Sequence, residues 1–281
     1  MIEIVKVENK DQEKEFVMFP FSLYKGCDYW VPPIISEELE SMDKEKNPVF
    51  ENAEAEFYIA KKDGVTVGRI AAMVNWVEIE EQKKNKLRFG WYDTIDDLEV
   101  SKKLLESVIE FGKKRKLEFV DGPVGFSNMD KAGLLIEGYE ELNTMITWYH
   151  YPYQKEHLKK LGFSKLAEWV EYKIKIFSAE DAPEKVKKFS KIIQQRYELK
   201  VLNFKSRKEI IPYVDKMFEL LNVTYSNLQT YVTIKQYQID FYKEKFIKYI
   251  HPDFIKCCLD KDDNLIAFLI TMPSFSRALK K

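Results

Sequence analysis

The sequence predicts a mixed α/β (α+β) fold in which a mostly antiparallel sheet is flanked by helices. Three observations carry this prediction. Asp63-Gly64 separates two strand-like runs, and a pair of this kind is typical of a tight β-hairpin. A strand, a helix and a strand follow over residues 86–123, which adds one parallel pair to the sheet. A second hairpin pattern over residues 254–272 predicts a partial second copy of the same fold.

The first hairpin forms the centre of the predicted sheet. Its second arm, residues 65–77, is apolar apart from Thr66, Arg69 and Asn75. A strand of that composition is typically covered on both faces.

A strand, a helix and a connector are predicted before the hairpin. Residues 2–7 alternate Ile or Val with polar residues, as a strand does. Residues 11–25 place apolar side chains at helical spacing, and Pro20 must kink or end that helix. Residues 30–33, Trp-Val-Pro-Pro, should be extended, because a residue before proline is driven out of the helical region. Residues 46–50 then form a turn.

After the hairpin, residues 86–93 predict a fourth strand, and a helix follows to about Arg115. Thr94 and Asp97 have the spacing of a capping box at its start, with Asp in place of Glu. The helix carries one apolar stripe, made of Val100, Leu104, Val108 and Phe111. Residues 117–123 then predict a buried strand parallel to its predecessor.

The rest of the first copy is less regular. Residues 122–138 are rich in glycine and predict an irregular loop. Residues 152–160 predict a short helix closed by Gly162, and alternation over residues 163–177 predicts one or two strands.

A polar stretch at residues 178–183 predicts the boundary between a first domain (1–177) and a second (178–281). Pro183 suits the first turn of a new helix with Val186, Phe189, Ile193 and Tyr197 on one face. A strand at 199–204, helices at 212–225 and 233–250, and the second hairpin follow.

The two hairpins align when one is shifted by 199 positions, which places Asp63 on Asp262 and Met73 on Met272. Chance similarity of two amphipathic hairpins is the alternative. The second copy lacks the last part of the first. We therefore expect either a fragment of a longer protein, which we favour, or completion by a partner chain. Self-association through the C-terminal strand is a further possibility.

Composition and charge exclude several classes of protein. A formal net charge of -1 argues against a nucleic-acid partner. No apolar run reaches the roughly 20 residues that span a bilayer, so we expect no membrane partner. The N-terminus lacks a signal-peptide pattern, and the three cysteines do not suit a disulfide framework. We therefore expect a cytoplasmic protein. The three histidines show no metal-binding spacing.

Several motifs in this order resemble the GNAT superfamily of acyl-CoA-dependent N-acyltransferases. The general ones are Asp63-Gly64-(x)3-Gly68-Arg69-Ile70-Ala71 in the hairpin and Leu161-Gly162-Phe163 after the penultimate helix. More narrowly, the chain resembles a bacterial GNAT-like group through Trp30-Val31-Pro32-Pro33, Asn47-Pro48, residues 133–139 and Tyr151-Pro152-Tyr153. The resemblance covers residues 23–172 well and implies a GNAT-like fold in tandem copies, the second truncated.

The resemblance also implies acetyl-CoA or another acyl-CoA as cofactor of the full-length protein, and a small-molecule or peptide amine as acceptor. GNAT enzymes hold the CoA pyrophosphate at a helix N-terminus after a Q/R-x-x-G-x-G/A loop. Residues 94–99 stand at that place here, without glycine and with Asp96, Asp97 and Glu99, which would repel a pyrophosphate. We therefore expect a degenerate first acyl-CoA site, no cofactor for this chain by itself, and the working cofactor loop beyond residue 281.

The catalytic candidates are tyrosines. The family often uses a tyrosine five residues before the Phe of Gly-Phe to reprotonate the departing thiolate, but that position is Leu158 here. Tyr149 and Tyr153 lie nearby and are the candidates, although tyrosines at a helix edge are more often packing residues.

Five further residues are ligand-binding candidates: Arg69, Trp91, Asp93, Asn128 and Glu137. Arg69 is a charge in a buried strand, which indicates either a structural ion pair or a ligand anchor. The loop with Asn128 and Glu137 either lines a cleft or is ordinary surface.

Two functions remain open from the sequence. The chain is either part of a tandem GNAT-like acyltransferase, whose first copy shapes the acceptor side of the site, or a non-catalytic protein that binds a small ligand or partner on the same fold.

Overall fold

The computed structural model describes residues 1–175, 178, 180–228, 230–246 and 250–281. The chain forms two compact units. Unit 1 contains Met1–Glu168, Gln229–Val232 and Ser274–Lys281, and unit 2 contains Trp169–Leu228 and Thr233–Pro273.

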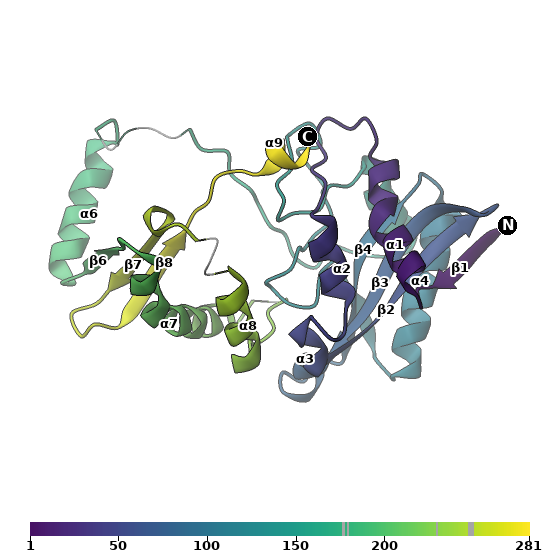
Figure 1. Cartoon of the computed structure of the whole chain (residues 1–281), viewed down its shortest axis with the longest axis horizontal. Coiled ribbons are helices and arrows are strands. Elements are labelled where there is room, and N and C mark those ends of the chain that lie inside the picture. The colour runs from purple at the N-terminus through teal and green to yellow at the C-terminus, as the bar shows by residue number, and fades with distance from the viewer. Residues whose placement is uncertain (176–177, 179, 229, 247–249) are drawn as a thin grey trace. The chain divides into compact units, whose positions relative to one another are not determined.

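Unit 1 holds twelve elements, most of which are labelled in Figure 1: β1 (Ile2–Lys6), α1 (Lys10–Leu23), α2 (Ile35–Met42), the 3₁₀ helix η1 (Pro48–Glu51), β2 (Ala53–Lys62), β3 (Val65–Asn75), α3 (Trp76–Glu80), β4 (Lys86–Thr94), α4 (Leu98–Lys114), β5 (Phe119–Asp121), α5 (Pro152–Lys160) and α9 (Ser276–Leu279). Unit 2 holds α6 (Glu184–Arg196), β6 (Lys200–Asn203), α7 (Arg207–Tyr225), α8 (Gln236–Phe246), the 3₁₀ helix η2 (Pro252–Phe254), β7 (Ile255–Leu259) and β8 (Leu265–Ile270).

The sheet of unit 1 has the order β1-β2-β3-β4-β5. Its first three pairs are antiparallel, and β4 pairs with β5 in parallel through α4. The predicted fold class is therefore confirmed. The hairpin between β2 and β3 turns at Asp63 (φ 53°) and Gly64 (φ 81°), the two left-handed residues that a type I′ turn requires.

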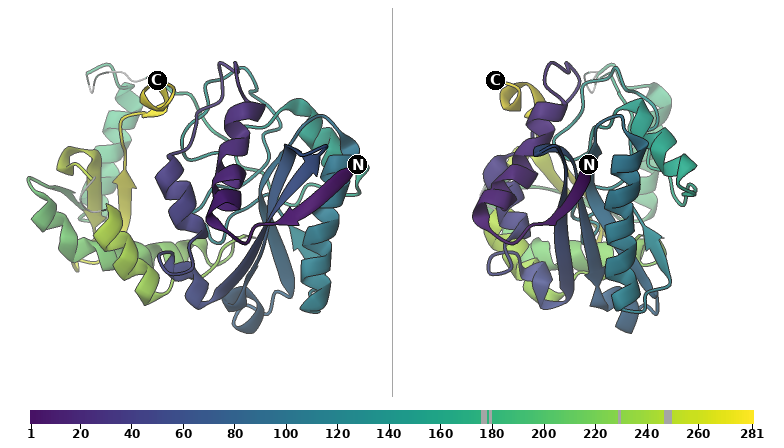
Figure 2. Two further views of the ribbon diagram at one scale, coloured as in Figure 1. Left: turned by 45° about the vertical axis from the view of Figure 1, so that its right-hand side comes forward. Right: turned by 90° about the vertical axis from the view of Figure 1, so that its right-hand side faces the viewer.

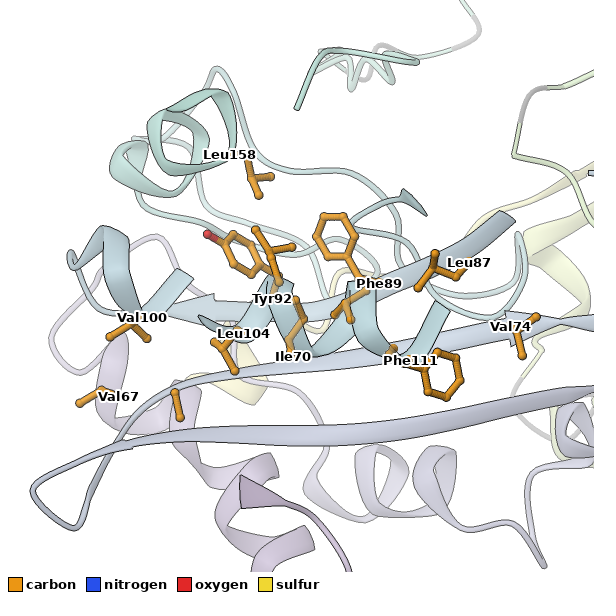
Figure 3. Packing of buried hydrophobic residues seen from close by; sticks show 14 residues of the cluster. Val67, Ile70, Val74, Leu87, Phe89, Tyr92, Val100, Leu104, Phe111 and Leu158 are labelled. Atoms are coloured by element: carbon orange, nitrogen blue, oxygen red, sulfur yellow. The ribbon is translucent and has the colours of Figure 1, made fainter. Parts of the chain in front are cut away.

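Helices cover both faces of this sheet, and Figure 2 shows α4 on one side and α1 and α2 on the other. On the α4 side, Val100, Leu104 and Phe111 face the apolar side chains of β3 (Figure 3). Leu158 of α5 belongs to the same core. On the other side, Phe16 and Val17 of α1 pack with alternate residues of β2 and β3. The strand β3 is thus buried on both faces, as its apolar sequence predicts.

A bulge interrupts the pairing of β3 with β4. Arg69 pairs with Asp93 and Ala71 with Gly90, so two residues of β4 lie opposite Ile70. One of them, Trp91, has a φ of 47°, a left-handed conformation that is uncommon for a bulky residue. Bulges of this kind re-aim side chains and are over-represented next to active sites.

Three local predictions for the part of the chain before residue 178 were wrong. The strand β5 covers only Phe119–Asp121, and Phe119 is 47% exposed, so it is not the buried strand expected over residues 117–123. Thr94 ends β4 and takes no part in a capping box; Asp97 alone is the N-cap of α4 and accepts a hydrogen bond from the Glu99 amide at 3.0 Å. Residues 163–175 contain no strand, and residues 176 and 177 lie outside the described part of the chain. Leu166 and Tyr172 are 55% and 80% exposed there, because the alternating pattern has no neighbouring strand edge to pair with.

In unit 2, β6, β7 and β8 form an antiparallel sheet in that order. The predicted hairpin is confirmed, and five residues connect its strands, whereas two connect β2 and β3. Helix α7 begins at Arg207 rather than Pro212, because Glu209 accepts from the Lys205 amide at 2.9 Å and opens the helix earlier. Helix α8 begins at Gln236 rather than at residue 233, and residues 247–249 of that prediction lie outside the described residues.

Candidate functional site

The bulge of β4 gathers polar side chains from distant parts of unit 1. Arg69 Nε donates to Asp93 Oδ2 at 2.8 Å, and both side chains are buried. The Tyr24 hydroxyl, from the residue that caps the end of α1, donates to Asp93 Oδ1 at 2.6 Å. Burial, followed by the Asp93 carboxylate, raises the pKa of Tyr24 well above its usual value. Arg69, Asp93 and Tyr24 therefore form one buried hydrogen-bonded group.

A second pair of charges lies beside this group. Glu38 of α2 accepts from the indole N–H of Trp91 at 2.6 Å, and Lys131 Nζ lies 3.9 Å from its other oxygen. Burial lowers the pKa of Lys131, and the nearby Glu38 carboxylate opposes that effect. The bulge thus turns Trp91 toward a carboxylate that the sequence pattern does not mark.

A small cavity of about 20 Å³ lies among these side chains, which is room for about one water molecule. Its polar lining residues are Tyr24, Glu38, Arg69, Asp93, Lys131, Thr147 and Tyr149. Trp30 and Trp148 supply much of the aromatic wall. In this conformation the cavity does not admit a substrate, and a larger ligand would have to displace part of the lining.

The two tyrosines proposed as catalytic acids both donate to main-chain carbonyl groups. Tyr149 Oη donates to the carbonyl oxygen of Tyr139 at 3.1 Å, and Tyr153 Oη to that of Thr94 at 2.7 Å. Burial raises the pKa of both hydroxyls. Tyr149 lines the cavity, whereas Tyr153 lies on α5 at the edge of β4.

The N-terminus of α4 is occupied by the side chains of the chain itself. The Asp97 carboxylate accepts from the Glu99 amide and forms an ion pair with Lys62 at 3.1 Å. The pKa of Asp97 is lowered, chiefly by its hydrogen bond with Lys62. An anion that bound the first amides of this helix would meet a carboxylate already in place.

Helix α5 fills the edge of β4 beyond the end of β5. Gln154 Nε2 donates to the carbonyl oxygen of Tyr92 at 3.2 Å, next to the bond from Tyr153 to Thr94. An extended ligand that added to this edge would need the same carbonyl groups. This edge is therefore closed by side chains of α5.

A Ser-His-Asp arrangement also lies here, but its geometry is not that of a nucleophilic triad. His157 Nδ1 is 2.8 Å from Ser101 Oγ, and His157 Nε2 is 3.2 Å from Asp96 Oδ1. Ser101 is fully buried and the Asp96 side chain is 70% exposed, the reverse of the burial a catalytic triad needs. The contact fixes α5 against the start of α4.

The remaining two candidates lie away from the cavity. The Asn128 amide, in its hydrogen-bonded orientation, donates to the carbonyl oxygen of Thr230 at 2.9 Å and accepts from the Val232 amide at 3.0 Å. Glu137 is exposed in the loop that follows β5. The structure thus brings Arg69, Trp91, Asp93 and Tyr149 together and leaves Asn128, Glu137 and Tyr153 apart.

Sequence patterns missed Tyr24, Glu38 and Lys131 as site residues. They come from the end of α1, from α2 and from the loop after β5, and no local motif connects them. The only signal was the periodicity of α1, which marks Tyr24 as facing the core. Within the described part of the chain, no cluster of His, Cys, Asp or Glu side chains is arranged as metal ligands. Nor does any described helix combine the length and apolarity needed to cross a membrane.

No family model matches the chain. Protein YghO of Escherichia coli (strain K12) is 26% identical over 275 residues, which cover 96% of this chain and 68% of YghO. The Bacterial ceramide synthase of Caulobacter vibrioides (strain NA1000 / CB15N) is 23% identical over 174 residues. That match covers 61% of this chain and 45% of the synthase, so less than half of the synthase is represented.

Among the solved structures similar to this chain are a tandem GNAT protein and several acetyltransferases. A tandem GNAT protein from the clavulanic acid biosynthesis pathway is 10% identical to this chain, with a TM-score of 0.45. The match covers 97% of this chain and 76% of the tandem GNAT protein. A predicted acetyltransferase from Clostridium acetobutylicum, solved with acetyl-CoA, is 12% identical, with coverages of 62% and 96% and a TM-score of 0.38. An aminoglycoside acetyltransferase from an uncultured soil metagenomic sample is 10% identical, with coverages of 63% and 97% and a TM-score of 0.38.

The order of elements in unit 1 is the one that the GNAT resemblance implied: strand, helices, hairpin, strand–helix–strand and closing helix. The order of elements expected from the GNAT resemblance is therefore confirmed for this unit, although the strands expected after Gly162 are absent from the described residues.

Proposed function

We propose that the protein is an N-acyltransferase of the GNAT type, which transfers an acyl group from an acyl-CoA to an amine. The observation that carries the proposal is the β4 bulge on a GNAT-like sheet. A strained residue, Trp91, and two acid–base pairs from separate elements meet there. Strained backbone and perturbed ionisable groups cluster at functional sites.

A relative supports the same type of bond formation. The Caulobacter vibrioides relative is named a ceramide synthase, and a ceramide is the amide of a fatty acid with a long-chain amine. A long-chain amine is therefore the first acceptor to test, followed by other small-molecule and peptide amines.

The reaction requires few groups from the protein. The amine nitrogen attacks the thioester carbonyl carbon, the C–S bond breaks, the amine loses a proton and the CoA thiolate gains one. Glu38 suits the role of base, because its carboxylate lies at the bulge and its nearest cation, Lys131 Nζ, is 3.9 Å away. Arg69 and Asp93 neutralise each other, so they suit the role of a positioning pair.

We further propose that the acyl-CoA site of unit 1 is degenerate. Asp97 occupies the α4 N-terminus, and Gln154 and Tyr153 occupy the β4 edge. The working acyl-CoA site would then lie elsewhere in the protein, with unit 1 shaping the acceptor side.

Unit 2 is proposed to be a partial second copy. Its strands β6, β7 and β8 are antiparallel neighbours in the same order as β1, β2 and β3, with helices between the first strand and the hairpin in both units. This similarity supports the proposed division into tandem domains and does not depend on the activity.

The test is a turnover assay on the full-length gene product. Released CoA thiol is measured with acetyl-CoA and a long-chain acyl-CoA against a panel of amines that includes a long-chain amino alcohol. The proposal predicts thiol release that depends on one class of amine. Glu38→Gln should lower kcat/KM at least about 100-fold. Its matched control is Glu37→Gln, an exposed neighbour on α2, which should have no effect.

The second candidate is a non-catalytic binding protein on the same fold. The closed α4 N-terminus and the closed β4 edge favour it. It predicts no thiol release with any amine and no heat on titration of acyl-CoA. Amine-dependent release would exclude it, whereas absence of both signals would remove the acyltransferase.

A further inference from the structure

Helix α6 of unit 2 presents an apolar face that no described part of the unit covers. None of its residues is buried, and within unit 2 it makes no extensive contact with another described element. Val186, Phe189 and Ile193 are 59%, 51% and 47% exposed. They recur at intervals of three and four residues, so they lie on one side of the helix.

A helix of this kind needs a partner. It has 13 residues, and isolated helices below about 12–15 residues are marginal in water. Amphipathic helices in folded proteins are stabilised mainly by packing their apolar face. Because no described part of unit 2 packs against the stripe of α6, we look for its occupant outside this unit.

The charge of α6 indicates what that occupant is. The helix carries five basic side chains and one acidic side chain, Glu184; the basic ones are Lys185, Lys187, Lys188, Lys191 and Arg196. At 100° per residue, the three lysines at 187, 188 and 191 lie opposite the apolar stripe, and Lys185 and Arg196 flank it. The helix is thus strongly cationic although the whole chain has a net charge of -1.

We propose that α6 binds the surface of an anionic lipid bilayer, with Val186, Phe189 and Ile193 in the boundary between headgroups and acyl chains. Basic residues on the polar face and aromatic or aliphatic residues on the other are the pattern of helices that lie in this interface. A protein core would bury the same stripe without needing the concentration of positive charge. The expectation of no membrane partner rested on the lack of a spanning segment, which a surface helix does not require.

The proposal is independent of the acyltransferase activity, because it concerns adhesion alone. The test is flotation of the full chain with vesicles of phosphatidylcholine, with and without phosphatidylglycerol. We expect binding to the anionic vesicles, little binding to the neutral ones, and loss of binding at high salt.

Two variants separate the contributions of charge and apolar contact. The triple variant Lys187→Glu, Lys188→Glu, Lys191→Glu should weaken binding by at least about 100-fold, because the loss of each positive charge alone costs about five-fold. Phe189→Ser with Ile193→Ser should also weaken binding while retaining the salt dependence. The matched control reverses three exposed lysines of unit 1, Lys102, Lys113 and Lys160, and should keep most of the binding despite the same net charge.

Circular dichroism of each variant checks that it is folded. Failure of the wild-type chain to float with anionic vesicles would overturn the proposal. Binding to neutral vesicles as strong as binding to anionic vesicles would also overturn it. The same would follow if the control variant lost as much binding as the α6 triple variant. A chain that instead forms oligomers through α6, and does not float, would show that the apolar stripe is a protein interface and would also overturn it.

Discussion

At the scale of single residues, Arg69 illustrates what a sequence leaves open. A lone cation in a buried strand is either a structural partner or a ligand anchor, and nothing in the local sequence separates the two. The structure pairs it with Asp93 and also directs it to the carbonyl oxygen of Phe16 at 3.0 Å. The Arg69 guanidinium thus already has partners. Through these two contacts it links β3 to β4 and to α1.

Breaking this pair should be costly. Arg69→Met leaves the Asp93 carboxylate buried without its cation, and we expect the free energy of unfolding to fall by about 3–5 kcal/mol. The double variant Arg69→Met, Asp93→Leu removes both charges and should recover most of that loss. Urea denaturation of both variants measures the difference. Equal stability of the single and double variants would contradict the structural role of the pair.

His150 gives the residue-scale prediction for pH. Burial lowers the pKa of His150 from 6.5 to about 4, so the ring is neutral in the folded protein at neutral pH. The unfolded chain binds a proton below about pH 6.5. The contribution of the neutral His150 ring to the free energy of unfolding is therefore complete above pH 6.5, and it is lost as the pH falls from 6.5 to about 4.

The expected loss is about 3 kcal/mol at the acidic end of this window. Unfolding free energies of wild type and His150→Gln at about pH 7, 5.5 and 4 measure it, since the variant lacks the titrating ring. As the pH falls from about 7 to about 4, the stability of wild type relative to the variant should fall by about 3 kcal/mol. A constant difference between them across the window would refute the assignment.

Only some residues of the candidate site could be predicted from sequence patterns. Arg69, Trp91 and Asp93 were predictable as candidates because they stand in or beside buried strands. Glu38 and Lys131 were not, because an acid on a short helix and a lysine in a loop look like solvated surface in any sequence. Their roles depend on the Trp91 bulge, which only the pairing of two strands creates.

At the scale of elements, the sequence predicted structure best where local chemistry decides it. The Asp63-Gly64 turn and the apolar stripe of α4 specify their elements without distant help. The strands predicted over residues 163–177 are absent from the described residues of that range, for the opposite reason. A strand requires a partner edge, and alternation alone does not provide one.

The β4 bulge provides the prediction at this scale. A Cβ on Gly90 would lie 2.5 Å from the carbonyl oxygen of Val124, a main-chain atom, so Gly90→Ala must shift the bulge or the loop after β5. We expect a loss of about 1–3 kcal/mol in unfolding free energy. Because Trp91 is the next residue, amine-dependent thiol release should fall as well.

Gly64→Ala is the matched control. A Cβ on Gly64 would meet no atom within 4 Å, but the residue has a φ of 81°, so alanine should cost about 1–2 kcal/mol through backbone strain alone. Activity per folded molecule should stay at the wild-type level. Equal effects of the two variants on activity would show that the bulge geometry does not matter for turnover.

At the scale of the whole molecule, the two units differ in how well their apolar surfaces are covered. Unit 1 has helices on both faces of its sheet, with buried cores on each side. In unit 2, Leu269 of β8 is 59% exposed and α6 has no buried residue. Composition and the repeat predicted two related units, but only the structure shows this difference in burial.

The location of acyl-CoA is the most direct test of the account. Hydrogen exchange of the full-length gene product should be measured with and without saturating acetyl-CoA. We predict protection in peptides outside residues 94–101, with unchanged exchange at the Glu99 amide, which already donates to Asp97. Protection centred on the amides of residues 97–101 would place the cofactor at the α4 N-terminus and contradict the degenerate first site.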